Sequence, residues 1–183
     1  MNASCAKSPS TTSRSPARTA AIAGIVGAAG LAAASGAGLF ARSPEPRGPR
    51  RVLITGAASG FGLELAKRFI ARGDFVIATD LHDAANEDVV KLGEKCTYRK
   101  LDVTSDADWE AAAEAIGAVD VLVLNAGIAV GGAIENVTMD TWHRALDINL
   151  LGAVRGCRAF VPLLEPGAQI VMTSSVAGLV HPI

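Results

Sequence analysis

Aromatic residues are scarce in this sequence, and their scarcity limits how its core can be built. Only 4% of the 183 residues are Phe, Trp or Tyr, whereas 50% of the chain is hydrophobic. Val, Leu, Ile and Ala must therefore fill the interior, as they do in parallel β-sheets that are buried on both faces. A chain of this length and hydrophobic content can bury the core of one domain.

Cysteine is also rare, since only Cys5, Cys96 and Cys157 occur. They are widely separated and odd in number, and they form no C-x-x-C pair and no cluster with His at metal-ligand spacing. The sequence therefore predicts no metal site, and it favours reduced or buried thiols over a disulfide framework.

Acidic residues are nearly absent from the first 51 residues, where Glu45 stands against seven Lys and Arg residues. Because the net charge of the whole chain is −1, the remainder of the chain is acidic. This charge distribution does not support a nucleic-acid-binding surface there, so we expect no nucleic-acid partner.

The N-terminal part, residues 1–49, is predicted to be a targeting or membrane-anchor segment followed by a Pro-rich linker. Its uncharged run, residues 19–41, is long enough to cross a bilayer, but its many Ala and Gly residues make the transfer free energy marginal. Residues 4–19 are rich in Ser and Thr and contain basic residues but no acid, as organelle transit peptides do.

Three alternatives stay open for this segment: a membrane anchor with membrane contact through residues 19–41, a cleaved organelle-targeting segment, or a disordered tail on a cytoplasmic protein. A fluorescent reporter fused behind residues 1–51 distinguishes them by its location and its size on a gel. Residues 43–49 form a stiff Pro-containing linker, which places the start of the domain at residue 50.

The most informative stretch is a glycine-rich turn at residues 55–62, because of what lies on either side of it. Residues 51–54 form a short apolar, β-branched run that is typical of a buried parallel strand. Residues 63–72 have helical periodicity and stop at Gly73, a residue that often ends a helix.

A strand, a glycine-rich turn and a helix in this order build a dinucleotide phosphate site. Gly56 permits the tight turn, Gly60 lets the backbone approach the pyrophosphate, and Gly62 lets the helix pack close to the strand. The helix N-terminus then presents its unpaired N–H groups to the phosphates.

Asp80 ends a second predicted strand, residues 75–80, roughly twenty residues after the glycines. A carboxylate at this position accepts hydrogen bonds from the adenosine ribose hydroxyls and repels the additional phosphate of NADP. No Arg or Lys occurs at positions 57–59, 81 or 82 to offset that repulsion. The sequence therefore predicts NAD as the cofactor, with NADP less favoured, unless Asp80 merely starts a surface loop.

The rest of the chain continues the alternation of strands and helices. Further strands are expected at residues 96–103, 119–124 and 169–175, and helices at 86–93, 105–117 and 139–164. Right-handed crossovers then give an α/β Rossmann-like, doubly wound parallel sheet of order 3-2-1-4-5, with the cofactor crevice at the carboxyl ends of strands one and four. Strand five would form an exposed edge, which favours either instability or association, for example into a homo-oligomer.

The glycine spacing T-G-x-x-x-G-x-G resembles that of the compact, single-domain short-chain dehydrogenase/reductase (SDR) family. Other motifs similar to those of the family follow in the same order along residues 50–183. They are Asp102-Val103 after strand three, Asn125-Ala126-Gly127 at the end of strand four, Asn149 on the next helix and Ser175 after strand five.

This resemblance implies an NAD-dependent oxidoreductase that interconverts a secondary alcohol and a ketone, with the cofactor carrying the hydride. It implies that Ser175, or its neighbour Ser174, hydrogen-bonds the substrate oxygen, and that Asn149 holds a water that relays protons. The cofactor contacts that it implies are Thr55, Gly56, Ser59, Gly60, Phe61, Gly62, Asp80, Asp102, Val103, Asn125, Ala126 and Gly127.

The catalytic Tyr and Lys of that family have no counterpart in this sequence. They are expected in a Y-x-x-x-K motif beginning about a dozen residues after Ser175, whereas the sole tyrosine is Tyr98, on the predicted third strand. We therefore expect residues 50–183 to be the N-terminal portion of the domain, truncated at its C-terminal side. The alternative is a catalytically inactive dinucleotide-binding or regulatory module.

Overall fold

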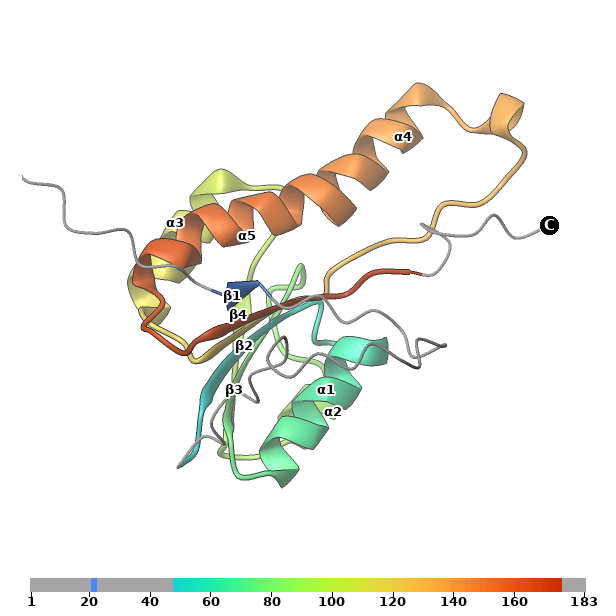
Figure 1. Ribbon diagram of the computed structural model, residues 1–183. Helices are drawn as coiled ribbons and strands as arrows, with labels where there is room; N and C mark the ends of the chain where they lie inside the picture. Colours follow the sequence, from blue (N-terminus) through green and yellow to red (C-terminus); the bar gives the residue numbers. More distant parts are fainter. Residues whose placement is uncertain (1–20, 23–47, 176–183) are drawn as a thin grey trace, which may run out of the picture.

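A computed structural model describes residues 21–22 and 48–175 (Figure 1). The predicted targeting or anchor segment and its linker, residues 1–49, therefore lie outside the described residues except for 21–22 and 48–49. No helix among the described residues is long and apolar enough to span a bilayer.

Five parallel strands follow the order that the sequence predicts. Along the sheet they lie as β4-β3-β2-β5-β6, which is the order 3-2-1-4-5 for the strands of the predicted domain. Their bounds are β2 Arg51–Thr55, β3 Phe75–Asp80, β4 Cys96–Lys100, β5 Val121–Leu124 and β6 Gln169–Met172. The carboxyl ends of β2 and β5 are adjacent at the switch in strand order, where open α/β sheets bind ligands.

Helices cover both faces of this sheet. Figure 1 shows α1 (Gly60–Ala71) and α2 (Glu87–Val90) on one face, and α3 (Asp106–Ile116) and α5 (Gly152–Phe160) on the other. Successive strand residues point to opposite faces, so β2 supplies both layers of the core.

The two faces of β2 illustrate this division. Val52 and Ile54 pack with Leu63 of α1, and Leu53 lies in the second layer with Trp109 and Phe160. These two aromatic rings meet edge to face, with their centroids 6.1 Å apart and an interplanar angle of 75°. The few aromatic residues of the domain thus include the largest side chains of its buried core.

Several elements are shorter than predicted: β5 begins at Val121 and β6 ends at Met172, and α2 and β4 are also shorter. The helix expected at 86–93 is the single turn α2, which Asn86 caps by accepting a hydrogen bond from the Val89 N–H at 3.0 Å. The strand expected at 96–103 ends as β4 at Lys100, because the residues from Asp102 onward fold into a turn that leads into α3.

The long helix expected at 139–164 is one helical segment with three geometries (Figure 1). It begins as α4 (Met139–Leu146), continues as a π-helical turn, residues 147–151, becomes α5, and ends in a 3₁₀ turn at Val161–Leu163. A short 3₁₀ turn, Ile134–Asn136, precedes it. We name residues 147–151 the π-turn; such turns recur at functional sites.

A sixth strand corrects the expectation that strand five is an exposed edge. Ala21–Ile22 forms β1, within the uncharged run 19–41, and pairs in parallel with Gln169 and Ile170 of β6. The exposed-edge prediction is therefore wrong for these two β6 residues. Among the described residues, Val171 and Met172 pair with β5 alone. The physical reason is that an edge strand presents unpaired N–H and C=O groups, which another segment can satisfy.

Candidate dinucleotide-binding site

A cavity of about 580 Å³ opens at the carboxyl ends of β2, β3 and β5, and we name it the dinucleotide cavity. Ten of the twelve predicted cofactor-binding residues line it: Gly56, Ser59, Gly60, Phe61, Asp80, Asp102, Val103, Asn125, Ala126 and Gly127. Thr55 and Gly62 do not line it, and both act on the shape of the turn instead. A volume of this size falls within the range of cofactor pockets.

The glycine turn has the backbone geometry that its sequence predicts. Gly56 and Gly60 have φ values of +65° and +52°, in the left-handed region that favours glycine. A Cβ on Gly56 would lie 2.9 Å from the Ala126 Cα, whereas a Cβ on Gly60 would meet no heavy atom within 4 Å. A Cβ on Gly62 would collide with the Gly56 carbonyl. Gly56 and Gly62 thus permit close packing, and Gly60 leaves room for a ligand beside the backbone.

Thr55 and Asn125 join the ends of three strands. The Thr55 hydroxyl accepts hydrogen bonds from the backbone N–H groups of Asn125 and Ala126, at 2.9 and 3.0 Å. The Asn125 amide donates to the carbonyls of Thr55 and Gly56 and accepts from the Thr173 hydroxyl at 3.0 Å. Both side chains therefore fix the walls of the cavity through internal bonds, which the sequence motif alone does not reveal.

Asp80 ends β3 beside the glycine turn, as predicted. Its Oδ2 accepts a hydrogen bond from the Ala58 N–H at 2.9 Å, and its Oδ1 accepts one from the Leu81 N–H at 2.8 Å. Each carboxylate oxygen has a second lone pair, so the group can still accept hydrogen bonds from a ligand. The two backbone donors hold the carboxylate in one orientation at the cavity wall.

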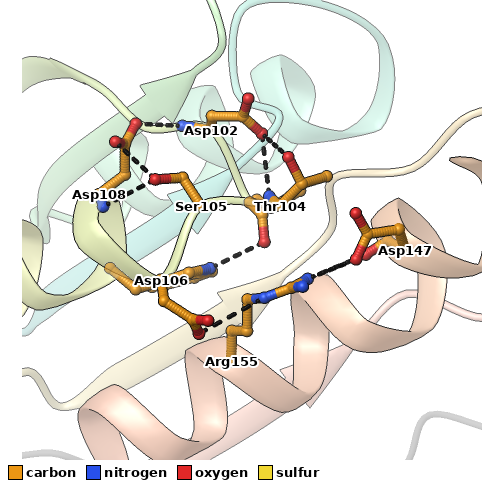
Figure 2. Close-up of polar contacts among 9 residues, drawn as sticks. Asp102, Thr104, Ser105, Asp106, Asp108, Asp147 and Arg155 are labelled. Carbon is orange, nitrogen blue, oxygen red and sulfur yellow. Dashed lines mark hydrogen bonds and ion pairs between the residues drawn. The ribbon is translucent and has the colours of Figure 1, made fainter.

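Asp102 lies in a turn that the Asp108 side chain of α3 stabilises (Figure 2). Asp102 Oδ1 accepts from the N–H and the hydroxyl of Thr104, at 2.9 and 2.7 Å. The Asp102 N–H donates to Asp108, and this hydrogen bond, together with one from Ser105, holds the pKa of the Asp108 carboxyl below its ordinary value despite its partial burial.

Residues at the start of α3 also stabilise this turn. Ser105 caps the helix by accepting from the Asp108 N–H at 3.1 Å, which confirms the predicted helix start. The Trp109 indole N–H donates to the Val103 carbonyl at 3.1 Å. Asp102 and Val103, two of the predicted cofactor contacts, are therefore held by short-range hydrogen bonds at the start of α3 and by the buried Trp109.

Asn149 lies in the π-turn and reaches the loop after β5. Its Oδ1 accepts from the Ile128 N–H at 2.8 Å, and its Nδ2 donates to the Ile128 carbonyl at 2.9 Å. The π-turn is closed by a hydrogen bond from the Gly152 N–H to the Asp147 carbonyl. These bonds tie the predicted proton-relay residue to the strand end that carries Asn125.

Arg155 is a structural residue of this region that the sequence analysis missed. Its guanidinium donates to Asp147 Oδ1 at 2.7 Å and to the Asp147 carbonyl at 3.4 Å, and its Nε lies 3.5 Å from Asp106 Oδ1 (Figure 2). Asp106 begins α3, so Arg155 joins the turn near Asp102 to the π-turn. Arg155 follows Gly152 by about one helical turn and belongs to no motif, so the sequence alone does not indicate that it joins these two turns.

A second cavity, of about 220 Å³, brings Asn149 together with Ser174, and we name it the serine cavity. Thr55, Met172 and Thr173 also line it. Both candidate serines are exposed, and of the two only Ser174 is among the residues that line this cavity. The catalytic role of either serine stays a prediction.

Tyr98, on β4, lines neither the dinucleotide cavity nor the serine cavity. Its hydroxyl donates to the His82 carbonyl at 2.7 Å. Burial and the charges of Asp80 and Asp83 raise the pKa of this phenol, so it stays protonated and engaged at neutral pH. The described residues contain no cluster of His, Cys, Asp and Glu that could hold a metal ion.

Comparison with known proteins identifies relatives of this chain. A family model described as short chain dehydrogenase matches residues 50–183. The 3-alpha-(or 20-beta)-hydroxysteroid dehydrogenase of Mycobacterium bovis is 39% identical over 134 residues, which are 69% of this chain and 52% of that protein. Retinol dehydrogenase 8 of Bos taurus is 36% identical over 143 residues, 72% of this chain and 46% of that protein. The chain thus spans about half the length of these curated relatives.

Solved structures resemble it to a similar extent. A short-chain dehydrogenase/reductase from Burkholderia phymatum in complex with NAD has a TM-score of 0.67 and 32% identity, covering 74% of this chain and 52% of its own. A glucose/ribitol dehydrogenase-type protein from Brucella melitensis has a TM-score of 0.68 and 30% identity, covering 73% and 60%. Both the sequence and the fold therefore point to the same relatives.

Proposed function

The chain belongs to the short-chain dehydrogenase/reductase family, and on that premise we propose that it is the NAD-binding portion of an enzyme that interconverts a secondary alcohol and a ketone. The names of its relatives support a lipophilic small-molecule substrate, since they include hydroxysteroid and retinol dehydrogenases. The NAD complex of a structural neighbour supports the choice of cofactor class.

One observation carries the preference for NAD: the Asp80 carboxylate at the end of β3. It lines the dinucleotide cavity with the glycine turn, and two backbone N–H groups orient it. A fixed carboxylate there accepts ribose hydroxyls and repels a 2′-phosphate. The open space at Gly60, where a Cβ would meet no heavy atom within 4 Å, also supports a dinucleotide approaching the backbone there.

The residues of this chain would then bind and orient the reactants. NAD, when bound, supplies hydride acceptance and donation at its nicotinamide ring. Asn149 is fixed by Ile128 and would hold a water at the π-turn, while Ser174 or Ser175 would donate a hydrogen bond to the substrate oxygen.

The first prediction tests the cofactor assignment. Asp80→Ala removes the ribose acceptor and the charge that repels the 2′-phosphate, so the variant should bind NAD more weakly and discriminate less against NADP. Calorimetric titration of the folded 183-residue chain with each dinucleotide measures both effects. Glu110→Gln, at an exposed carboxylate on α3, is the control. If the unmodified chain binds NADP more tightly than NAD, the role given to Asp80 is wrong.

A second candidate function is a catalytically inactive dinucleotide-binding or regulatory module. The observation that favours it is the position of Tyr98, whose hydroxyl is bonded to His82 and cannot replace the tyrosine of a Y-x-x-x-K motif. The transcript sequence beyond codon 183 distinguishes the two candidates, because a Y-x-x-x-K motif shortly downstream supports the enzyme.

A further inference from the structure

One positively charged side chain, that of Arg144, lines the dinucleotide cavity, and it belongs to none of the motifs found in the sequence. Among the described residues that line it, Arg144 of α4 is the single Lys or Arg, and it faces a set that includes two carboxylates, Asp80 and Asp102. The residue lies far from the glycine turn in the sequence and belongs to α4, which extends past the carboxyl ends of the strands (Figure 1).

The carboxylates around Arg144 are already engaged by other groups. Asp80 accepts from two backbone N–H groups, and Asp102 Oδ1 accepts twice from Thr104. Asp147, which lies one turn further along the helix, is bound by Arg155 at 2.7 Å (Figure 2). No hydrogen bond or ion pair of the Arg144 guanidinium occurs within the described part of the chain, so this guanidinium is available to an anion.

A neighbouring cavity indicates which end of a dinucleotide Arg144 would meet. This outer cavity, of about 570 Å³, shares four lining residues with the dinucleotide cavity: Leu81, Asp102, Arg144 and Ile148. No residue of the glycine turn lines it. Arg144 therefore lines both cavities, as does Leu81, the residue that follows Asp80, whereas the glycine turn that would hold the pyrophosphate lines, of these two, only the dinucleotide cavity.

We propose that Arg144 is a cofactor-specificity residue, whose guanidinium contacts the 2′-phosphate of NADP and offsets part of the repulsion from Asp80. This inference rests on the proposed function, because it requires a dinucleotide in the cavity. Arg is suited to phosphate, since its planar donors match two phosphate oxygens. The chain would then prefer NAD but retain a measurable affinity for NADP.

The test is a calorimetric titration of the 183-residue chain with NAD and NADP, at low and high salt. Arg144→Gln should lower the affinity for NADP by about fivefold, the value of a contact worth about 1 kcal/mol at an exposed site, and change that for NAD much less. Arg144→Lys should restore part of the NADP affinity, and the salt dependence of NADP binding should fall in Arg144→Gln. Arg158→Gln, an exposed arginine on α5, is the matched control and should change neither affinity.

The outcomes separate this inference from the proposed function. If Arg144→Gln lowers the affinities for NAD and NADP equally, the arginine contacts the pyrophosphate that both share, and the specificity role is overturned. Unchanged affinities in a folded Arg144→Gln, matching Arg158→Gln, would also overturn it while leaving dinucleotide binding intact. An unmodified chain that binds neither dinucleotide would refute the proposed function and the inference with it.

Discussion

Single residues shape the glycine turn, and Gly56 is constrained both by its backbone conformation and by its neighbours. It combines a positive φ of +65° with a position where a Cβ would lie 2.9 Å from the Ala126 backbone. We predict that Gly56→Ala destabilises the fold by more than the cost of positive φ alone and abolishes dinucleotide binding, because either the turn or the Ala126 strand end must move. Thermal unfolding and calorimetric titration with NAD measure the two effects.

Gly93 provides a matched control for this prediction. It also has a positive φ, +78°, but a Cβ there would meet no heavy atom within 4 Å. Gly93→Ala should therefore cost only the backbone strain, about 1–2 kcal/mol, and leave nucleotide affinity unchanged. Equal destabilisation in both variants, with NAD affinity preserved in Gly56→Ala, would mean that the contact with Ala126 is unimportant.

Asp74 links the stability of the domain to pH. Its nearly buried carboxylate is 3.0 Å from the Arg50 guanidinium and accepts the Arg50 N–H. Burial raises the pKa of this carboxyl, but the hydrogen bonds from Arg50 and the charges of Arg50 and Arg72 outweigh it, so the pKa lies below its ordinary value. A lowered pKa in the folded state stabilises the fold above the pKa of the unfolded chain, and this stabilisation is lost as pH falls.

We therefore predict that Asp74→Asn lowers the free energy of unfolding by about 1.5–3 kcal/mol at neutral pH. The difference from the parent should begin to shrink as pH falls below about 4, the ordinary pKa of an Asp side chain, and should be lost once pH has fallen through the lowered pKa of Asp74 in the folded parent. Urea unfolding across this pH range measures it, with Glu110→Gln as the control for an exposed carboxylate. A difference that stays constant down to pH 2 would contradict the linkage.

The roles of residues that act through local backbone geometry could be predicted from the sequence. The roles of residues that act through distant partners could not. The positive φ of Gly56 and the cap at Ser105 follow from rules of turns and helix ends. The bonds of Asn125 and the position of Arg144 depend on segments that meet only in the folded chain.

At the scale of elements, the π-turn is the feature on which the placement of Asn149 depends. Arg155 binds the Asp147 side chain and carbonyl, and it approaches Asp106 at the start of α3. We predict that Arg155→Met loosens the π-turn and weakens the bond between Asn149 Oδ1 and the Ile128 N–H. Hydrogen exchange at the Ile128 amide should then accelerate by about fivefold, for a loss of about 1 kcal/mol.

Arg158→Met is the control, since its side chain is exposed on the same helix. It should leave exchange at Ile128 at the parental rate. Unchanged protection of the Ile128 amide in Arg155→Met would show that the helical hydrogen bonds hold the π-turn without the guanidinium.

Element order was predictable because apolar periodicity and glycine stops are local signals. The lengths of α2 and β4 and the change of helix type after Leu146 were not. In the helical segment, the apolar pattern continues through the π-turn, so periodicity alone predicts one regular helix. The extra residue in the turn is stabilised by Asn149 with Ile128 and by Arg155 with Asp147, both of which are tertiary contacts.

For the whole molecule, the described part holds the dinucleotide cavity and the serine cavity, and the sequence contains no Y-x-x-x-K motif. We predict that the 183-residue chain shows no appreciable oxidation of secondary alcohols with NAD, because no residue of the sequence takes the place of the acid–base tyrosine. An NADH absorbance assay across a panel of secondary alcohols measures this. Turnover that disappears in Ser174→Ala or Ser175→Ala would show that another group transfers the proton.

Self-association also belongs to this scale and stays a prediction. It was expected from an exposed edge at strand five, and β1 covers only the Gln169 and Ile170 half of that edge. Sedimentation across a range of concentrations tests whether the remaining half, Val171 and Met172, suffices for pairing between copies.

The pairing of β1 with β6 sets an order of events during synthesis. The ribosome releases Ala21–Ile22 early, but their partners Gln169 and Ile170 lie near the other end of the sequence. The β2–β3 and β3–β4 ladders join segments that are close in sequence and can form while translation continues. β1 therefore stays without its β6 partner until β2, β3, β4 and β5 have all been translated, because this pairing joins the two strands of the described sheet that lie farthest apart in the sequence.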